Sequence, residues 1–297
     1  MTTLSTFSQL LSENVANAAS GVARVEARPR LSASGLVWSA DGLIVTAHHV
    51  LEREENIRVG LEDGRVVNAA LVGRDPRTDI AVLRAEAGDL APLRWADADS
   101  LRVGHLALAL GRPGQSVQAT LGILSVVGDG RRLPTGGLLD KHIQSDAEMY
   151  PGFSGGPLLG ADGTVMGMNT TMLLRGASLT LPHATVARIV DALVANGHVR
   201  RGWLGIGAQP VRLPSSLEAQ LGQETGLMLA SVEQGSPAER GGLVMGDVVV
   251  KLDGQPIRTL DELLSVLGEE IIGKDTQVTV IRGGQVSQLR LTVGERG

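Results

Sequence analysis

The stretch GFSGGPLLGADGTVMGMNT, residues 152–170, decides the fold, because it sets one serine among glycines and continues as two short apolar runs. Glycines beside Ser154 leave room for a substrate carbonyl and let the backbone N–H groups converge on one point. The apolar runs are separated by Ala161-Asp162-Gly163, which predicts strand, turn and strand. A nucleophile elbow of the α/β-hydrolase kind would need a helix here instead. We therefore predict a nucleophilic serine on a framework of strands.

The chain around this stretch repeats the pattern of short strands. From residue 21 to 180, β-prone runs such as 43–46, 57–61 and 105–110 alternate with turn sequences such as Glu62-Asp63-Gly64. Glycine is common, with 39 residues, and aromatic residues make up only 2% of the chain, which favours strands joined by tight turns over long helices. Regular short strands of this kind are typical of an antiparallel barrel or sandwich.

Two upstream segments offer the partners that a serine nucleophile needs. Serine is a poor nucleophile unless a base takes its proton and a carboxylate orients that base. The segment 45–50 carries the pair His48-His49 after a predicted strand, and Asp79 opens the next candidate strand. The order histidine, aspartate, serine is that of the chymotrypsin type. The other histidines lack this context and are interpreted as structural or solvated: His105, His142, His183 and His198.

Four segments together resemble proteases of the HtrA/Deg family. In chain order they are SGLVWSADGLIVTAHHV (34–50), VGRDPRTDIAVLR (72–84), RVGHLALALGRPG (102–114) and the stretch 152–170. The resemblance implies a chymotrypsin-like double β-barrel protease domain with its active site in the cleft between the barrels. It also implies a trypsin-like serine endopeptidase with the catalytic residues His49, Asp79 and Ser154, in which His49 rather than His48 is the base.

The same resemblance implies the groups around the triad. The N–H groups of Gly152 and Ser154 would form the oxyanion hole, and Met149 would lie near the floor of the first specificity pocket. An apolar residue there favours cleavage after small or aliphatic residues. The segment expected to pair with the substrate backbone comprises Ser178, Leu179, Thr180 and Leu181.

Two positions beside the nucleophile depart from the family pattern. Phe153 stands where an asparagine is usual, and Pro151 stands where an arginine is common. The departures leave open how this loop changes between inactive and active shapes.

The last hundred residues resemble a PDZ domain of the same family, an α+β fold. The resemblance rests on RGWLGI (201–206) and SPAERGGLVMGDVVVKLDGQPI (236–257). A peptide C-terminus is expected at the loop and strand formed by Trp203, Leu204, Gly205 and Ile206. Capping boxes at Ser236–Glu239 and Thr259–Glu262 predict two helix starts. The helix after Thr259 would form the other wall through Leu260, Leu263 or Leu264, and the alternative is that these leucines belong to the core.

Apolar spacing outside the strands predicts two longer helices. One covers residues 4–19, and the other covers 184–196 and ends at Gly197. We divide the chain into an N-terminal arm (1–20), a protease domain (21–197) and a PDZ domain (198–297). The family resemblance implies a homotrimer formed through the protease domain, with Phe7 as a candidate contact. The alternative is that the first helix packs only on its own chain.

Composition limits the partners. The net charge of −5 argues against nucleic acid or an anionic membrane as the main partner. The chain has no cysteine and no HExxH-like cluster, so we expect no disulfide, no metal and no cofactor. No apolar run approaches the ~18 residues of a membrane span. No signal peptide is recognisable in residues 1–19, so the sequence as it stands predicts a cytoplasmic protein, or a periplasmic or otherwise exported one if a leader has been removed.

The leading hypothesis is an ATP-independent serine endopeptidase that hydrolyses unfolded or misfolded polypeptides in protein quality control. Two alternatives remain. The first is a peptide-binding chaperone or scaffold with weak or absent proteolysis, and the second is a hydrolase of small esters. Degradation of casein would separate the protease from both.

Overall fold

The computed structural model describes residues 3–133, 135–174 and 177–296. The chain divides into two compact units, Met1–Val199 and Arg200–Gly297. Among the described residues, no helix has both the length and the apolar character needed to cross a bilayer.

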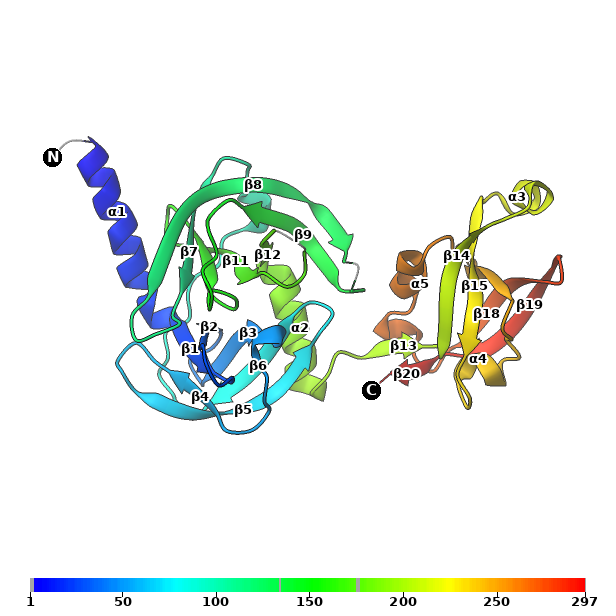
Figure 1. The fold of residues 1–297 in the computed structure, drawn as a ribbon, viewed down its shortest axis with the longest axis horizontal. Coiled ribbons are helices and arrows are strands. Elements are labelled where there is room, and N and C mark those ends of the chain that lie inside the picture. Colours follow the sequence, from blue (N-terminus) through cyan, green and yellow to red (C-terminus); the bar gives the residue numbers. More distant parts are fainter. Residues whose placement is uncertain (1–2, 134, 175–176, 297) are drawn as a thin grey trace. The chain divides into compact units, whose positions relative to one another are not determined.

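Six antiparallel strands close into the first barrel of the N-terminal unit (Figure 1). Neighbouring strands follow the order β1-β2-β3-β6-β5-β4, and β4 pairs with β1 to complete the ring. Ile44, Ile57 and Leu83 fill the interior and are at most 1% exposed. The strands are β1 (Val22–Glu26), β2 (Ala33–Val37), β3 (Leu43–Ala47), β4 (Ile57–Gly60), β5 (Val66–Asp75) and β6 (Ile80–Ala85).

A second closed barrel of six strands follows in the same unit, with the order β10-β11-β12-β9-β8-β7. Leu124, Ile143 and Leu158 lie in its interior. The predicted mainly β fold with two barrels is thereby confirmed. The strands are β7 (Leu106–Gly111), β8 (Gln118–Arg132), β9 (Leu138–Ser145), β10 (Pro157–Gly160), β11 (Val165–Thr170) and β12 (Leu179–Leu181).

A third core joins the two barrels to helix α2 (His183–Asn196). Val186, Ile189 and Leu193 of the helix pack against buried residues of both barrels. The helix ends at Gly197, whose φ of 76° lies in the left-handed region that closes many helices. The helix predicted over 184–196 is confirmed. Short 3-10 turns lie at η1 (Ala19–Gly21), η2 (His48–Val50) and η3 (Ala98–Ser100).

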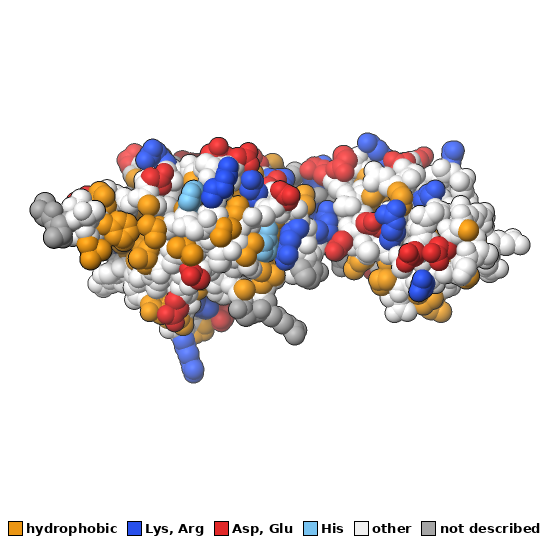
Figure 2. Space-filling view, turned by 90° about the horizontal axis from the view of Figure 1, so that it is seen from above, with side chains coloured by type: hydrophobic (Ala, Val, Ile, Leu, Met, Phe, Trp, Pro, Cys, Tyr) orange, Lys and Arg blue, Asp and Glu red, His pale blue; other side chains and the backbone are white. Residues whose placement is uncertain are grey.

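Helix α1 (Thr3–Ala18) packs on the rest of its unit through its second half. Leu11 and Val15 pack against the core between the barrels, and the Asn14 side chain donates a hydrogen bond of 2.7 Å to the carbonyl of Ala161. The helix predicted over 4–19 is confirmed. Its first turns leave large apolar side chains in solvent, and Figure 2 shows hydrophobic side chains gathered at this end of the unit. The exposed residues are Leu4, Phe7 and Leu10.

The C-terminal unit is an antiparallel sheet with short helices. Its main strands follow the order β14-β15-β16-β18-β19, and β17 pairs with β16. Leu227, Leu252 and Val278 form part of its core. The strands are β13 (Arg201–Trp203), β14 (Ile206–Arg212), β15 (Thr225–Val232), β16 (Val248–Leu252), β17 (Gln255–Pro256), β18 (Asp275–Arg282), β19 (Gln285–Thr292) and β20 (Gly294–Arg296), and the helices are α3 (Ser215–Leu221), α4 (Pro237–Arg240), α5 (Leu260–Val266) and η4 (Glu269–Ile271).

The two predicted capping boxes differ in the structure. At α5, Thr259 and Glu262 exchange both hydrogen bonds, so this box is confirmed. At α4, the Ser236 hydroxyl accepts from Glu239 N–H as predicted, but the Glu239 carboxylate accepts from Gly235 N–H instead of Ser236. At Ser236–Glu239, therefore, only one of the two hydrogen bonds of a capping box is present.

Candidate active site

Asp79 and His49 form a close pair in the first barrel. Asp79 is buried at the junction of β5 and β6, with a φ of 56°, a left-handed conformation that aspartate tolerates better than most residues. Its Oδ1 accepts from the backbone N–H of His49 at 2.8 Å, and its Oδ2 lies 2.8 Å from His49 Nδ1. A proton on Nδ1 is thus held by the carboxylate, which leaves Nε2 with a free lone pair.

The neighbouring His48 has a different environment. Only its backbone touches Asp79, through an N–H that donates to the Asp79 carbonyl at 3.0 Å. Burial lowers the pKa of the His48 ring, and its Nδ1 has no partner among the described residues. The carboxylate of Asp79 therefore orients His49 and not His48.

Thr170 and Thr171 join Asp79 to the serine loop. The hydroxyl of Thr170 donates to Asp79 Oδ2, and the hydroxyl of Thr171 lies 3.2 Å from Ser154 Oγ. Because these two threonines are consecutive, Ser154 and Asp79 lie in the same region. Among the described residues, no hydrogen bond joins Ser154 Oγ to the ring of His49. Catalytic hydrogen bonds are often loose without substrate, so this geometry is compatible with a triad.

The first barrel also holds the backbone of the serine loop. The Ser34 hydroxyl donates to the Gly152 carbonyl at 2.6 Å, and the Ser34 N–H donates to the Ser154 carbonyl at 3.3 Å. A Cβ atom at Gly155 would lie 2.1 Å from the Ser34 carbonyl oxygen, and its φ is 88°. Only glycine fits so close to the neighbouring backbone. The N–H groups of Gly152 and Ser154 have no acceptor within the described part of the chain.

Phe153 gives a physical reason for the departure from asparagine. Its side chain is 0% exposed and lies in the core of the second barrel. The ring packs edge-on against Tyr150 with 5.6 Å between centroids. A Cβ atom at Gly111 would lie 2.5 Å from the Phe153 ring, so the missing side chain at Gly111 makes room for it. Pro151 is exposed to solvent.

The segment predicted to pair with substrate is largely occupied by other strands. Met149 is half-buried against the core of the second barrel, and Ser178 is half-buried ahead of β12. Thr180 of β12 pairs with Asn169 on one side and with Ile143 on the other. The side chains of Leu179 and Leu181 belong to the core between the barrels.

β12 therefore has no free edge at Thr180 for a substrate strand. The exposed residues next in the chain after β11 are instead Thr171, whose hydroxyl contacts Ser154, and Met172, whose N–H donates to the Thr170 hydroxyl at 3.2 Å. The one local signal for this segment, two consecutive threonines at the end of a predicted strand, was missed. Ser34 had no local signal, because its bonds reach residues more than a hundred positions away.

The C-terminal unit offers an exposed sheet edge beside a helix. Among the described strands, β14 pairs with β15 alone, and α5 packs beside it. Gly205 precedes the edge with a φ of 76°, and Ile206 begins it half-buried. Trp203 lies in β13, and Leu204 is buried in the core.

The leucines of α5 have different environments. Leu260 is 45% exposed, Leu264 is half-buried, and Leu263 is 2% exposed within the core. Leu260 and Leu264 are therefore the accessible members of the predicted wall, and Leu263 contributes to the core.

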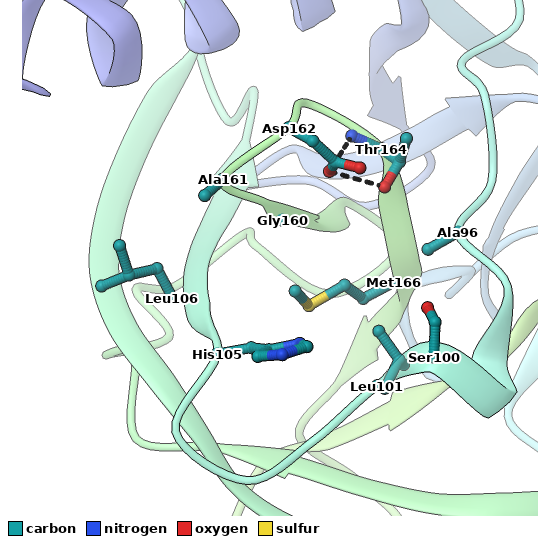
Figure 3. Close-up of a pocket in the computed structure, with 10 residues that line it drawn as sticks. All are labelled: Ala96, Ser100, Leu101, His105, Leu106, Gly160, Ala161, Asp162, Thr164 and Met166. Atoms are coloured by element: carbon teal, nitrogen blue, oxygen red, sulfur yellow. Dashed lines mark hydrogen bonds between the residues drawn. The ribbon is translucent and has the colours of Figure 1, made fainter.

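His105, His142 and His183 have surroundings different from those of His49. Burial lowers the pKa of His142 on β9, and His183 lies between Trp38 and Trp95 with centroid distances of 5.6 Å and 4.9 Å. His105 lines a cavity of about 280 Å³ at one end of the second barrel, together with Met166 and Asp162 (Figure 3). That cavity contains no triad residue. No group of three metal-ligating side chains is present among the described residues.

Comparisons with known proteins match both units. The model of the trypsin-like peptidase domain matches residues 33–168, and the model of the PDZ domain matches residues 202–293. A probable periplasmic serine endoprotease of the DegP-like kind from Halomonas elongata is 37% identical over 268 residues, which is 88% of this chain and 56% of the relative. A protein of the same description from Pseudomonas fulva is 37% identical over 267 residues, 88% of this chain and 55% of the relative. The chain thus spans little more than half the length of these relatives.

Solved structures match over nearly the whole chain. The HtrA-type protease AlgW with a tripeptide is 32% identical, with a TM-score of 0.75, and the match covers 96% of this chain and 97% of that one. AlgW with a decapeptide has 30% identity, a TM-score of 0.78, and coverage of 96% and 98%. A serine endoprotease from Yersinia pestis has 28% identity, a TM-score of 0.78, and coverage of 96% and 98%.

Proposed function

Since this chain belongs to the HtrA family of trypsin-like proteases with a PDZ domain, we propose that it is an ATP-independent serine endopeptidase of unfolded or misfolded polypeptides. The observation that carries the proposal is the double contact between Asp79 and His49, with Ser154 attached to the same group through consecutive threonines. These contacts tie three residues from distant parts of the chain to one cluster, which supports a His49-Asp79-Ser154 triad.

In the proposed reaction, His49 Nε2 takes the proton of Ser154 Oγ while that oxygen attacks a peptide carbonyl. Asp79 holds the Nδ1 proton and stabilises the imidazolium that forms. His49 then gives the proton to the leaving amine, and water repeats the sequence to release the acyl group. In this reaction the hydroxyl of Ser154 must first leave its contact with Thr171 and turn toward His49.

The oxyanion of the intermediate would be held by the N–H groups of Gly152 and Ser154. Their position depends on Ser34, which fixes the Gly152 carbonyl on the opposite side of the loop. Loss of one donor in such a site costs about 3–4 kcal/mol of barrier height.

We further propose that Met149 favours small or aliphatic residues before the cut. Met149 lies against the apolar core that contains Phe153. The substrate would lie along the exposed residues Thr171 and Met172, of which Thr171 contacts Ser154 through its hydroxyl. A cleavage profile from a peptide library, if dominated by arginine or lysine before the cut, would overturn this specificity.

Degradation of casein by the wild type and by Ser154→Ala tests the proposal. We expect cleavage by the wild type and none above background by the variant, with the two proteins equally stable. Equal cleavage by both would refute the role of Ser154.

A peptide-binding chaperone is the second candidate, because the Ser154 hydroxyl contacts Thr171 and not His49 in this structure. Suppression of aggregation of an unfolded protein, with no cleavage of that protein, would favour the chaperone. Turnover of small esters without protein cleavage would favour the ester hydrolase.

For the PDZ domain we propose binding of peptide C-termini along the edge of β14. The carboxylate would be held by backbone N–H groups near Gly205 and Ile206, and Leu260 and Leu264 would contact the last side chain. A peptide with a free carboxylate should bind at least about tenfold more tightly than its amidated form. Equal affinity of the two forms would contradict this mode.

The exposed apolar residues Leu4, Phe7 and Leu10 support a homotrimer formed with the help of α1. Light scattering of the full chain and of a chain without residues 1–19 tests this assembly, and an unchanged mass would refute the role of the helix. The names of the DegP-like relatives support a periplasmic location, which cell fractionation tests.

A further inference from the structure

A polar cavity of about 380 Å³ lies on the N-terminal unit, away from the proposed triad. It is formed where the turn between β4 and β5 meets the loop after β7. Three arginines and two carboxylates line it: Arg24, Arg65, Arg112, Glu62 and Asp63.

Arg112 is the central observation, because its side chain is charged and almost fully buried. The residue is 3% exposed. Its Nη1 donates to the Gln115 carbonyl at 2.8 Å and its Nη2 donates to the Ala19 carbonyl at 2.7 Å, while Nε has no acceptor among the described residues. Burial lowers the pKa of this guanidinium, yet arginine remains protonated in proteins.

No carboxylate of the described residues lies within ion-pair distance of Arg112. A buried charge without a counter-charge is unfavourable unless something compensates it. Two backbone carbonyls satisfy part of the guanidinium, but neither of them carries a net negative charge. A negative ligand in the adjoining cavity would supply the missing charge.

Arg24 lies on the same cavity and also has a buried Nε without a partner among the described residues. Its guanidinium is stacked on Gly60, where a Cβ atom would lie 3.0 Å from Arg24 Nε. One terminal nitrogen pairs with Glu26 at 2.6 Å, but Arg24 Nε is buried without a partner within the described chain. Glycine at position 60 thus leaves space for a planar cation against the strand.

The two carboxylates at the rim do not neutralise these arginines. Asp63 is engaged by Arg65, with 2.6 Å between Oδ2 and Nε and 2.9 Å between Oδ1 and the backbone N–H. Glu62 is exposed and makes no hydrogen bond in the described part of the structure, although its charge acts on Arg112. Arg24 pairs with Glu26 and Arg65 pairs with Asp63, so among the described residues the buried guanidinium of Arg112 is the lining cation left without an ion pair.

We propose that this cavity binds a small oxyanion, a phosphate or carboxylate group, through the guanidinium groups of Arg24 and Arg112. The planar donor fork of arginine matches both kinds of group. Arg112 also connects this site to the serine loop. Its backbone N–H donates to Ser34 Oγ at 2.8 Å, and the Ser34 hydroxyl donates to the Gly152 carbonyl. The anion site is separate from the proposed catalytic residues, and its test does not depend on proteolysis.

Calorimetric titration of the full chain with inorganic phosphate and, separately, with succinate tests the proposal at constant ionic strength. We expect saturable binding of one anion per chain and a higher melting temperature of the N-terminal unit. Binding of phosphate alone, of succinate alone or of both identifies the preferred group, and each of these results supports the site.

Variants then locate the site. Arg24→Gln should weaken the binding by about tenfold or more, since it removes a charged donor. Arg58→Gln is the matched control, because Arg58 pairs with the same Glu26 at 2.7 Å but does not line the cavity. Glu62→Gln should strengthen the binding, because it removes a negative charge from the rim.

Two results would overturn the proposal. One is the absence of saturable binding of either anion by the wild type. The other is equal weakening by Arg24→Gln and Arg58→Gln, which would indicate diffuse surface charge. The wild-type titration needs no variant to fold, so the proposal can fail on that measurement alone.

Discussion

Each unit of this chain has a glycine-bearing loop at its proposed binding site, and the two loops are held in different ways. In the peptidase unit, Gly155 lies against the backbone of Ser34, a residue of the other barrel. In the PDZ unit, Gly205 lies against the side chain of Ser236, which caps the nearby helix α4.

Because the two loops are held by different contacts, they should respond differently to mutation. The serine loop is held by Ser34 of β2, and β2 pairs with β3, the strand that leads to His49. A displacement of either barrel should therefore disturb the arrangement of Ser154 and His49. The loop at Gly205 is fixed from within one small unit, and the sheet edge beside it is backbone. Damage there should lower the affinity for a peptide without altering the triad.

Asp79→Asn should have the largest effect, and it should change the function of the peptidase unit alone. An amide cannot hold His49 in the required tautomer, so kcat for peptide cleavage should fall by about 10⁴-fold. Binding of a C-terminal peptide to the PDZ unit should stay unchanged. Asp89→Asn is the control, because Asp89 also has a left-handed backbone, with a φ of 57°, but is exposed. A fall of less than about tenfold for Asp79→Asn would contradict the triad.

Phe153→Ala should show that the two cores are independent. Removal of a fully buried ring costs about 3–5 kcal/mol of unfolding free energy. In a calorimetric scan, the transition of the peptidase unit should move down while that of the PDZ unit stays in place. Leu263→Ala, with an expected cost of about 2–5 kcal/mol, should do the reverse. Equal movement of both transitions by either variant would refute the independence.

Gly205→Ala tests the side-chain contact in the PDZ loop. The new Cβ would lie 2.3 Å from Ser236 Cβ, so the loop must shift, at a cost of about 1–3 kcal/mol beyond the backbone strain. The matched control is Gly235→Ala, since Gly235 has a φ of 70° with nothing within 4 Å. Denaturant unfolding of the PDZ unit should separate the two variants. Equal losses would show that the contact with Ser236 is unimportant.

Leu260→Ala should have a smaller effect, confined to binding. The side chain is 45% exposed, so the unfolding free energy should change by no more than about 0.5 kcal/mol. The affinity for a C-terminal peptide should fall about three- to tenfold, which corresponds to loss of part of one apolar contact. An unchanged affinity, measured by fluorescence anisotropy, would remove Leu260 from the proposed wall.

Mild acid should produce the smallest difference between the two units, a difference in their stability. All six histidines precede residue 200, and burial lowers the pKa of His48 and His142. The folded peptidase unit then binds fewer protons than the unfolded chain, so its stability should fall as the pH drops below the ordinary histidine pKa of about 6.5. The PDZ unit has no histidine and should not respond in that range. His142→Gln should reduce the slope of unfolding free energy against pH. An unchanged slope would show that His142 does not cause the effect.

The sequence predicted the parts of this molecule that depend on local patterns. Helices α1 and α2, the β framework and the capping box at Thr259 were all predicted from spacing and turn residues. The family resemblance supplied the double barrel and the PDZ fold. These features are readable because neighbouring residues determine them.

The parts that could not be predicted depend on contacts between distant segments. Ser34 and Arg112 carry no local motif, and their roles arise only when the two barrels meet. The segment 178–181 was expected to pair with substrate, but Thr180 already has strand partners on both sides. Periodicity shows that a residue lies in a strand, but it does not show which of its edges another strand occupies.

The burial of Phe153 has a consequence for the response to heat. The residue that precedes Ser154 in the chain is part of the second barrel's interior, so loosening of that interior must displace the nucleophile. Activity and tertiary structure should therefore disappear at the same temperature on warming. An enzyme whose serine loop stood free of the core would lose activity first and unfold later.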